Sequence, residues 1–221
     1  MKRSFSRLFA KELVGVGSTV KNETFARHRN VMNLMDKRGA IPTGVFIAPN
    51  ASVIGEVLVS NKVSIWYGAV LRADKNKMEI NYSTAIMDRA VLSTVPSLSS
   101  GFPAVLHIGE ECIIGPGSII TSCDIGDNVV VGAGAIIGEG SVIENNCYIA
   151  PGSVVPSGTF IPSGQLWAGN PAVYVRDVSG YEQDVRYKQI DSTYGLSKQH
   201  DEEFLPYPSN YYHAEEDANL I

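Results

Sequence analysis

Aliphatic residues recur at every sixth position through the second half of the chain, with one interruption after Ile120. The row runs Ile108, Ile114, Ile120, Ile125, Val131, Ile137, Ile143, Ile149, Val155 and Ile161. A small residue follows four positions after most members of the row, as at Cys112, Ser118 and Ala135. A period of six fits neither an amphipathic helix nor the simple alternation of a hairpin strand. It is typical of a hexapeptide β-helix, in which short strands wind into stacked coils.

The same period begins upstream, in the rows Ile47, Val53, Val59, Ile65, Leu71 and Ile80, Ile86, Leu92. Its phase is lost between Leu71 and Ile80 and again between Leu92 and Ile108. The second gap is rich in Ser and Pro and predicts a loop extruded from a coil. We therefore predict an all-β fold. It is a left-handed parallel β-helix over residues 44–172, with roughly six coils of about eighteen residues each.

Residues 1–43 precede the repeat. Within residues 1–18, apolar side chains at helical spacing alternate with basic ones, which predicts an amphipathic helix. Three interpretations stay open: a retained helix that docks on a membrane surface or a partner, a cleaved mitochondrial presequence, or a frayed terminal helix. The stretch 21–43 predicts an extended or partly helical connector.

Residues 173–221 follow the repeat, whose period ends near Asn170. The pattern Ser179-Gly180-Tyr181-Glu182 is a capping box and predicts a helix over about residues 180–196, folded back along the β-helix. The tail 197–221 is acidic and contains two prolines that forbid a long helix. It is expected to be either an extended arm on a partner or a solvated tail.

The composition argues against several classes of function. The chain has 221 residues, 44% hydrophobic and 19% charged, and a formal net charge of −5, which argues against general nucleic-acid binding. No apolar run approaches the length of a membrane-spanning helix. The three cysteines include no CxxC pair, and Cys112 and Cys147 fall on the small inward positions of the repeat. We expect them to be buried thiols in a reducing compartment.

Three segments resemble the γ-class carbonic anhydrases in order and spacing: 64–74 (SIWYGAVLRAD), 113–123 (IIGPGSIITSC) and 165–172 (QLWAGNPA). A further match, over 27–37 and 45–55, is similar to the γ-carbonic-anhydrase-like subunits of mitochondrial respiratory complex I. The resemblance covers about residues 1–196. It implies a trimer of β-helices, often a heterotrimer, on the matrix face of the membrane arm of NADH:ubiquinone oxidoreductase.

The resemblance also implies where a zinc site would lie. The family's zinc is held by three His, two from one subunit and one from its neighbour, and the aligned positions here are Ser93, Pro116 and Thr121. Proline has no side-chain donor, and hydroxyls are poor zinc ligands. The family's Arg72 and Asp74 are retained, two residues apart on one face of a strand, and the resemblance implies a role in subunit contact. We expect no bound metal, no cofactor and no catalytic residue.

Two hypotheses follow from this comparison. In the first, the chain is a catalytically inactive assembly subunit of complex I, peripheral on the matrix side of the mitochondrial inner membrane. Its partners would be other γ-carbonic-anhydrase-like subunits and membrane-arm subunits, with possible lipid contact through residues 1–18. In the second, it is an active enzyme, either a carbonic anhydrase with its metal elsewhere or an acyltransferase that uses the outward His107 as general base. A zinc site between two other subunits of the trimer is a third, weaker possibility.

Overall fold

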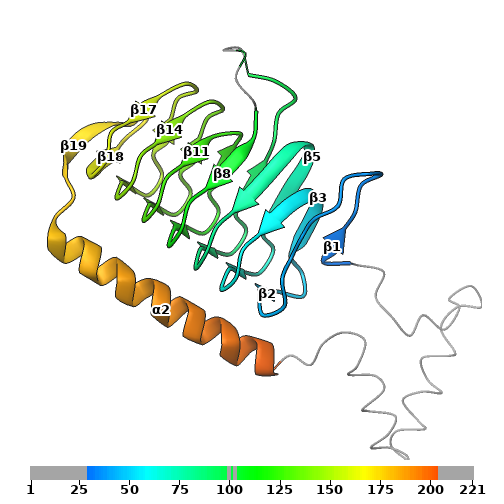
Figure 1. Ribbon diagram of the computed structural model, residues 1–221. Helices are drawn as coiled ribbons and strands as arrows, with labels where there is room; N and C mark the ends of the chain where they lie inside the picture. Colours follow the sequence, from blue (N-terminus) through cyan, green and yellow to red (C-terminus); the bar gives the residue numbers. More distant parts are fainter. Residues whose placement is uncertain (1–28, 99–100, 102–103, 204–221) are drawn as a thin grey trace, which may run out of the picture. The chain divides into compact units, whose positions relative to one another are not determined.

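The computed structural model describes residues 29–98, 101 and 104–203, which form a parallel β-solenoid with one helix alongside it (Figure 1). The strands are β1 (Val31–Met32), β2 (Phe46–Ile47), β3 (Ser52–Val59), β4 (Ser64–Ile65), β5 (Val70–Ile80), β6 (Ala85–Ile86), β7 (Val91–Ser93), β8 (Leu106–Ile108), β9 (Ile113–Ile114), β10 (Ile119–Thr121), β11 (Asp124–Ile125), β12 (Val130–Val131), β13 (Ile136–Ile137), β14 (Val142–Ile143), β15 (Tyr148–Ile149), β16 (Val154–Val155), β17 (Phe160–Ile161), β18 (Gln165–Ala168) and β19 (Val173–Asp177). The helix is α2 (Gly180–Glu203).

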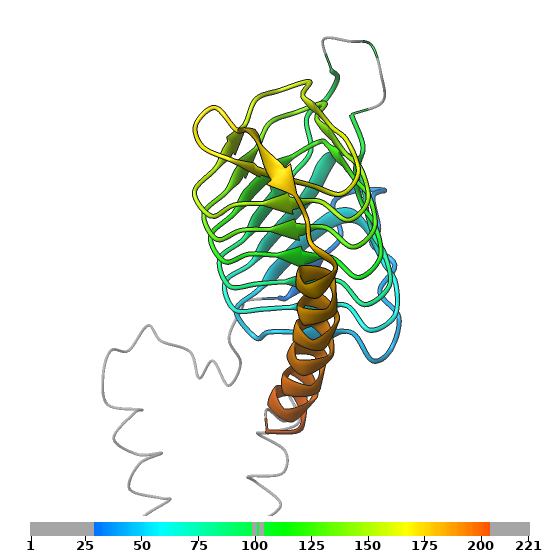
Figure 2. The ribbon, with the colours of Figure 1, turned by 90° about the vertical axis from the view of Figure 1, so that its left-hand side faces the viewer.

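Figure 2 shows the stacked coils from the side on which β19 lies, and the strands of these coils fall on three faces. The first face contains β7, β10, β13 and β16, and the second contains β8, β11, β14 and β17. Strands β3 and β5 bend from the first face into the second and join the two into one sheet. The third face is a separate sheet in the order β19-β18-β15-β12-β9-β6-β4-β2. All pairs are parallel except β18 with β19.

The aliphatic row forms the core, as the period predicts. Register pairs such as Leu71 with Leu92 and Leu92 with Ile120 place like residues directly above one another, and these side chains are fully buried. The small positions are buried too, including Cys112 and Ala135. Each buried aliphatic contributes on the order of 1.5–3 kcal/mol relative to an exposed one, so the stack as a whole supplies most of the driving force for folding.

Every break in the period falls at one corner, between the first and second faces. Ile80 lies nine positions after Leu71, Ile108 sixteen after Leu92, and Ile125 five after Ile120. The ladder nevertheless resumes in register beyond each break. The extra residues of the two longer breaks therefore project from the corner instead of disturbing the core, and the third break is one residue shorter than the period.

The first of these breaks differs from what the period indicates. Residues 70–80 are a single eleven-residue strand, β5, which bends across the corner with a register shift opposite Gly55 and Val57. Gly55 has a φ of 84°, and a Cβ there would lie 2.3 Å from the carbonyl oxygen of Ala73. Glycine therefore allows the two bent strands to stay paired. The second break is a loop, as predicted: its described residues 94–98, 101 and 104–105 form no strand.

Helix α2 covers the third face. Its start confirms the capping box, because the Ser179 N–H donates to the Glu182 carboxylate (2.9 Å) and the Glu182 N–H donates to Ser179 Oγ (3.3 Å). Ile190 packs on Ile113 and Val130 of the sheet. In the described part of the chain, no helix is long and apolar enough to cross a membrane.

The expected end of this helix at residue 196 is wrong, and so is the expectation of a non-helical tail from residue 197. The helix continues to Glu203 because its last turns remain on the solenoid, where Ser197 is buried. Residues 29–43 contain no helix: β1 pairs with β3, Leu34 and Lys37 close a turn, and Ala40 bridges Leu58. The predicted N-terminal helix and the rest of the tail lie outside the described residues.

The close approach of neighbouring coils at Gly132 gives a prediction about stability. A Cβ at Gly132 would lie 2.4 Å from the Pro151 nitrogen and 2.7 Å from the Ala150 carbonyl carbon of the next coil, which are backbone atoms that cannot move aside. Gly132→Ala is expected to lower the free energy of unfolding by about 1–3 kcal/mol, measured by chemical denaturation.

Gly195→Ala is the matched control. Gly195 lies in α2 with no atom within 4 Å of the added Cβ. This variant is expected to be as stable as the parent or slightly more stable, since alanine favours helix. If both variants changed the free energy of unfolding equally, the close contact between coils at Gly132 would not be what excludes a larger side chain.

Candidate functional site

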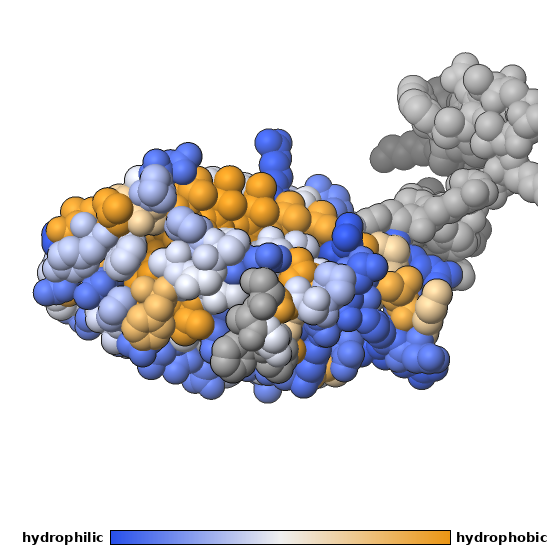
Figure 3. All heavy atoms as spheres, turned by 90° about the horizontal axis from the view of Figure 1, so that it is seen from above, coloured by the Kyte–Doolittle hydropathy of each residue, from blue (hydrophilic) through white to orange (hydrophobic). Residues whose placement is uncertain are grey.

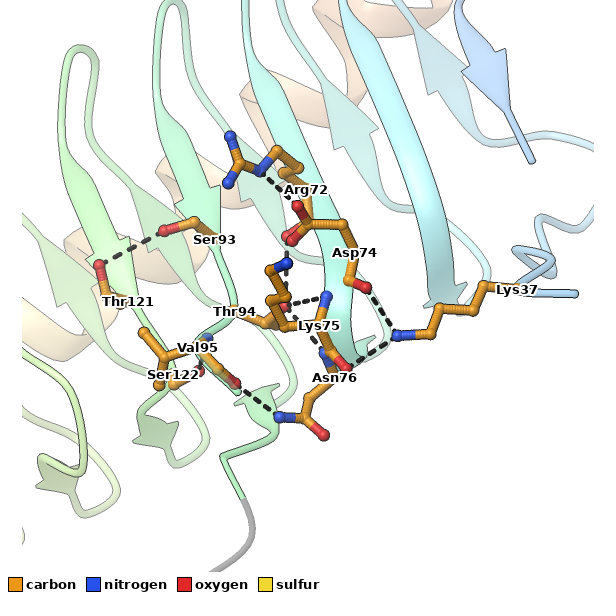
Figure 4. A network of polar contacts seen from close by, with 10 residues as sticks. All are labelled: Lys37, Arg72, Asp74, Lys75, Asn76, Ser93, Thr94, Val95, Thr121 and Ser122. Atoms are coloured by element: carbon orange, nitrogen blue, oxygen red, sulfur yellow. Dashed lines mark hydrogen bonds and ion pairs between the residues drawn. The ribbon is translucent and has the colours of Figure 1, made fainter. Parts of the chain in front are cut away.

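Two of the three aligned zinc-ligand positions lie together at the corner between the first and second faces (Figure 4). Ser93 ends β7 and Thr121 ends β10, and the two are register partners with their hydroxyl oxygens 3.4 Å apart. Arg72 of β5 pairs with Ser93 on the other side. The parallel ladder thus places Arg72, Ser93 and Thr121 in one outward column.

Pro116 is not part of this column. It is an exposed turn residue before β10, at the opposite edge of the first face, and its carbonyl accepts the Gly134 N–H (2.8 Å). Thr121 ends β10 five positions further along, so at most roughly 16 Å separates the two residues, with a turn at 116–117 between them. A site that used all three positions would therefore need Pro116 from a second chain.

The donor set at this corner does not fit a zinc ion. Ser93 and Thr121 offer neutral hydroxyls, whereas zinc in proteins takes His, Cys and carboxylate ligands. Among the residues that the structure describes, no three His, Cys, Asp or Glu side chains are grouped so that they could hold a metal. The carboxylate of Asp74, shown in the same view, is paired with Arg72.

The Arg72–Asp74 pair lies within one chain. Arg72 Nε is 3.1 Å from Asp74 Oδ2, and the Arg72 side chain is 54% exposed, so the pair itself stabilises the fold by no more than about 1 kcal/mol. Asp74 Oδ1 is buried and accepts no hydrogen bond within the described structure. Lys37 Nζ donates to the backbone carbonyls of Asp74 (2.6 Å) and Lys75 (2.8 Å). The pair is thus fixed in place with its guanidinium open to the outside.

Three further polar residues stabilise this corner by hydrogen bonds, and the repeat pattern of the sequence did not predict this role. Thr94 Oγ1 accepts the backbone N–H groups of Lys75 (3.3 Å) and Asn76 (3.1 Å). Asn76 Nδ2 donates to the Val95 carbonyl (2.5 Å), and Ser122 Oγ accepts the Val95 N–H (2.8 Å). These side chains tie the insertion in β5 to the loop after β7. They sit inside the interruptions of the repeat, where the period carries no signal.

His107 points outward from the second face, as its place beside Ile108 predicts. Its Nδ1 is 2.8 Å from Asp124 Oδ1 and its Nε2 is 3.1 Å from the amide nitrogen of Asn81. The hydrogen bond to Asp124 raises the pKa of His107, and the same bond lowers the pKa of Asp124. Both ring nitrogens are engaged within the chain, which is the geometry of a surface ion pair.

The three cysteines are free and buried, as expected for Cys112 and Cys147. Burial raises the pKa of Cys112 to about 12 and also raises the pKa values of Cys123 and Cys147. The thiolate is the form that binds metals and attacks electrophiles, and it is scarce at neutral pH when the pKa is so high. These thiols therefore act as small core residues.

The aromatic pair Trp66 and Tyr67 of the 64–74 segment has a structural role. Tyr67 Oη lies 2.8 Å from His200 Nδ1, and the rings of Phe46, Trp66 and Tyr67 surround the His200 ring at 5.3–6.2 Å between centroids. His200 comes from the last turns of α2, not from a separate tail as the sequence indicated. This cluster fastens the end of the helix to the solenoid.

Comparison with known proteins agrees with this architecture. The family model "Bacterial transferase hexapeptide (six repeats)" matches residues 122–157. A solved hexapeptide transferase family protein from Anaplasma phagocytophilum superimposes with a TM-score of 0.64 at 34% identity, covering 72% of this chain and 90% of that one. The fold is therefore that of the hexapeptide-repeat β-solenoids.

Two curated relatives from Arabidopsis thaliana narrow the class. Gamma carbonic anhydrase-like 2, mitochondrial, is 40% identical over 95% of this chain and 87% of its own length. Gamma carbonic anhydrase 3, mitochondrial, is 47% identical over 72% of this chain, but the chain spans only 62% of that relative. The chain belongs to the γ-carbonic anhydrase family, which confirms the resemblance seen in the sequence.

The His107–Asp124 pair predicts a pH dependence of stability. The pKa of His107 is raised from 6.5, so its contribution is complete below about pH 6.5 and is lost as the pH rises through the folded value. The pKa of Asp124 is lowered from 3.8, so its contribution is present above about pH 4 and is lost as the pH falls further. The pair should stabilise the fold most between about pH 4 and 6.5.

Thermal unfolding of His107→Gln tests this window. Both side chains are more than a third exposed, so the loss should not exceed about 1 kcal/mol, or about 2–4 °C in Tm. We expect this loss near pH 5.5 and a smaller one near pH 9. Asp124→Asn should behave alike, and the double variant should lose no more than either single one. A Tm difference independent of pH would contradict the ion pair.

Proposed function

We propose that the chain is a structural, catalytically inactive subunit of mitochondrial NADH:ubiquinone oxidoreductase, complex I. It would be one member of a trimer of γ-carbonic-anhydrase-like subunits on the matrix side of the membrane arm. The observation that carries this proposal is that the three positions aligned with the family's zinc ligands hold Ser93, Pro116 and Thr121 instead of His. The core of the solenoid around them is fully packed. The relatives named gamma carbonic anhydrase-like, mitochondrial, support the mitochondrial location.

The distribution of apolar side chains supports assembly. On the first face, the residues just before the inward row are themselves aliphatic: Val70, Val91, Ile119, Ile136 and Val154. Ile119 and Ile136 are exposed, and the others are half-buried. Figure 3 shows apolar side chains aligned along the length of the solenoid. A row of this length is typical of a surface that another protein covers.

This aliphatic row would face the sister subunits. Helix α2 already covers the third face, so the first face remains for a neighbouring solenoid. Arg72 lies on this face with its guanidinium accessible, where it can contact that neighbour. In this arrangement the left-handed solenoid, residues 44–172, is the platform. Residues 1–18 would reach the lipid surface or the arm, and residues 173–221 would complete the outer side. No nucleic acid and no cofactor are part of the proposal.

Isolation of the native protein tests the complex I role directly. After mild detergent solubilisation and a blue native gel, the chain should migrate with NADH:ubiquinone oxidoreductase activity. Mass spectrometry of that band should identify other γ-carbonic-anhydrase-like subunits. Recovery solely as a free homotrimer would overturn the proposal.

Zinc content tests the inactive site. The purified wild-type chain should hold no zinc by mass spectrometry and should not accelerate CO₂ hydration. Ser93→His, Pro116→His and Thr121→His together would restore the family's ligands, and this triple variant should bind roughly one zinc per chain in the trimer.

The double variant Ser93→His with Thr121→His is the control, because it lacks the ligand from the neighbouring chain and should bind zinc far more weakly. Zinc and CO₂ hydration in the wild-type chain would support the alternative, an active hexapeptide-repeat enzyme, and would contradict the structural role.

The first face predicts a selective effect on assembly. Ile136→Lys places a charge in the aliphatic row and is expected to convert trimers into monomers, measured by light scattering after size exclusion. Val142→Lys is matched, since Ile136 is 39% and Val142 37% exposed, but Val142 lies on the second face. The control should remain trimeric. Dissociation of both variants, or of neither, would contradict the assignment of the face.

A further inference from the structure

The C-terminal end of the solenoid carries a second unusual surface, the strand β19. It pairs antiparallel with β18 and, among the described residues, with no other strand, so it forms the edge of the third-face sheet. All five of its residues are exposed. Val173, Tyr174 and Val175 are 57%, 49% and 52% exposed, among the highest values for apolar residues in the described chain.

Exposed edge strands usually carry protection, because their unpaired N–H and C=O groups are a template for another strand. The two charged residues of β19 give little protection here. Arg176 is held by both carboxylate oxygens of Glu182 at 2.8 and 2.6 Å, and Asp177 accepts the Tyr174 hydroxyl at 3.1 Å. Both charges lie at the second half of the strand. The first half, Val173 to Val175, stays apolar and open.

At the opposite end of the solenoid, a segment of the chain lies on the outer strand. There β1 pairs with β3, and Ala40 bridges Leu58, so residues 31–40 of the chain itself cover an outer edge. That segment is also charged, with Asp36, Lys37 and Arg38 in a row. β2, the other edge of the third-face sheet, is only two residues long and its Phe46 is buried, so an exposed five-residue edge like β19 is not repeated at that end of the sheet.

We propose that β19 is a docking site for an extended, apolar segment of a different polypeptide, which adds a strand to the third-face sheet. Backbone groups on the free side of β19 would supply the hydrogen bonds, and Val173, Tyr174 and Val175 would supply the side-chain contacts. The inference rests on the proposed function, because it takes the segment from a non-identical subunit of the same assembly.

The chemistry of the edge favours such a segment over two other occupants. A lipid surface recruits proteins with accessible basic groups, and the Arg176 charge is already neutralised by Glu182. A second copy of this chain would bring β19 against β19 and join two solenoids end to end. That arrangement would occupy the end with an identical trimer, whereas the proposed function requires contact with unlike subunits.

Hydrogen exchange tests the strand pairing in the protein as it exists. Amide exchange of β19 is compared between the isolated trimer and the intact native assembly. We expect β19 amides to exchange at least about tenfold more slowly in the assembly, since strand addition pairs its free backbone groups. Amides in the middle of α2 should not change. Equal exchange of β19 in both states would overturn the proposal.

A cross-link identifies the occupant. A photoreactive residue in place of Val175 in the full-length chain should cross-link, in the assembly, to one extended peptide of a non-identical subunit. The same substitution at Val185, an exposed apolar residue of α2, should not cross-link to that peptide. A link to Val175 of a second copy, or to lipid, would overturn the proposal.

Charge substitution separates this inference from the proposed function. Val173→Lys with Val175→Lys should lower the amount of chain in the native assembly at least about tenfold and leave the trimer intact. Val185→Lys should be retained like the parent. If the wild-type chain is absent from the assembly, the proposed function fails. If the wild type is present and the double variant is retained equally, the docking site fails. Should the double variant misfold, exchange and cross-linking of the parent decide.

Discussion

The structure depends on one constraint, the register of the parallel ladder from coil to coil. Each inward aliphatic must lie over its counterpart in the neighbouring coil, since a single coil cannot bury its own apolar row. The close approach of backbone at Gly132 and the bend at Gly55 both follow from this stacking. Insertions are tolerated where they leave the register unchanged, which explains why all of them emerge at the same corner.

That corner is also where the family's metal chemistry would lie, and the two facts are related. Residues at the corner are outward or inserted, so they can change without affecting the core. Ser93 and Thr121 occupy ladder positions that any polar residue can fill, and their hydroxyls simply face one another. The fold can therefore survive the loss of zinc ligands, while Trp66 and Tyr67 of the same family motif remain necessary to hold α2.

The three faces and the end of the solenoid have distinct surfaces, and this division supports the proposed role as a connecting subunit. The third face is closed by α2, the first presents an aliphatic row, and the second carries the ion pair of His107 with Asp124. The end presents the open strand β19. A monomeric enzyme has little reason to expose two separate apolar surfaces, whereas a subunit with unlike neighbours requires them.

The six-residue period by itself determined the solenoid, its inward row, the buried thiols and the outward position of His107, because these depend on spacing alone. The family motifs determined the class and located Ser93, Pro116 and Thr121. Tertiary structure decided what spacing cannot encode. It joined residues 70–80 into one bent strand and brought His200 onto Tyr67. It also extended α2 to Glu203 and left one edge of β19 unpaired by any other described strand. Each of these depends on contacts between residues far apart in the chain, and such contacts leave no local pattern.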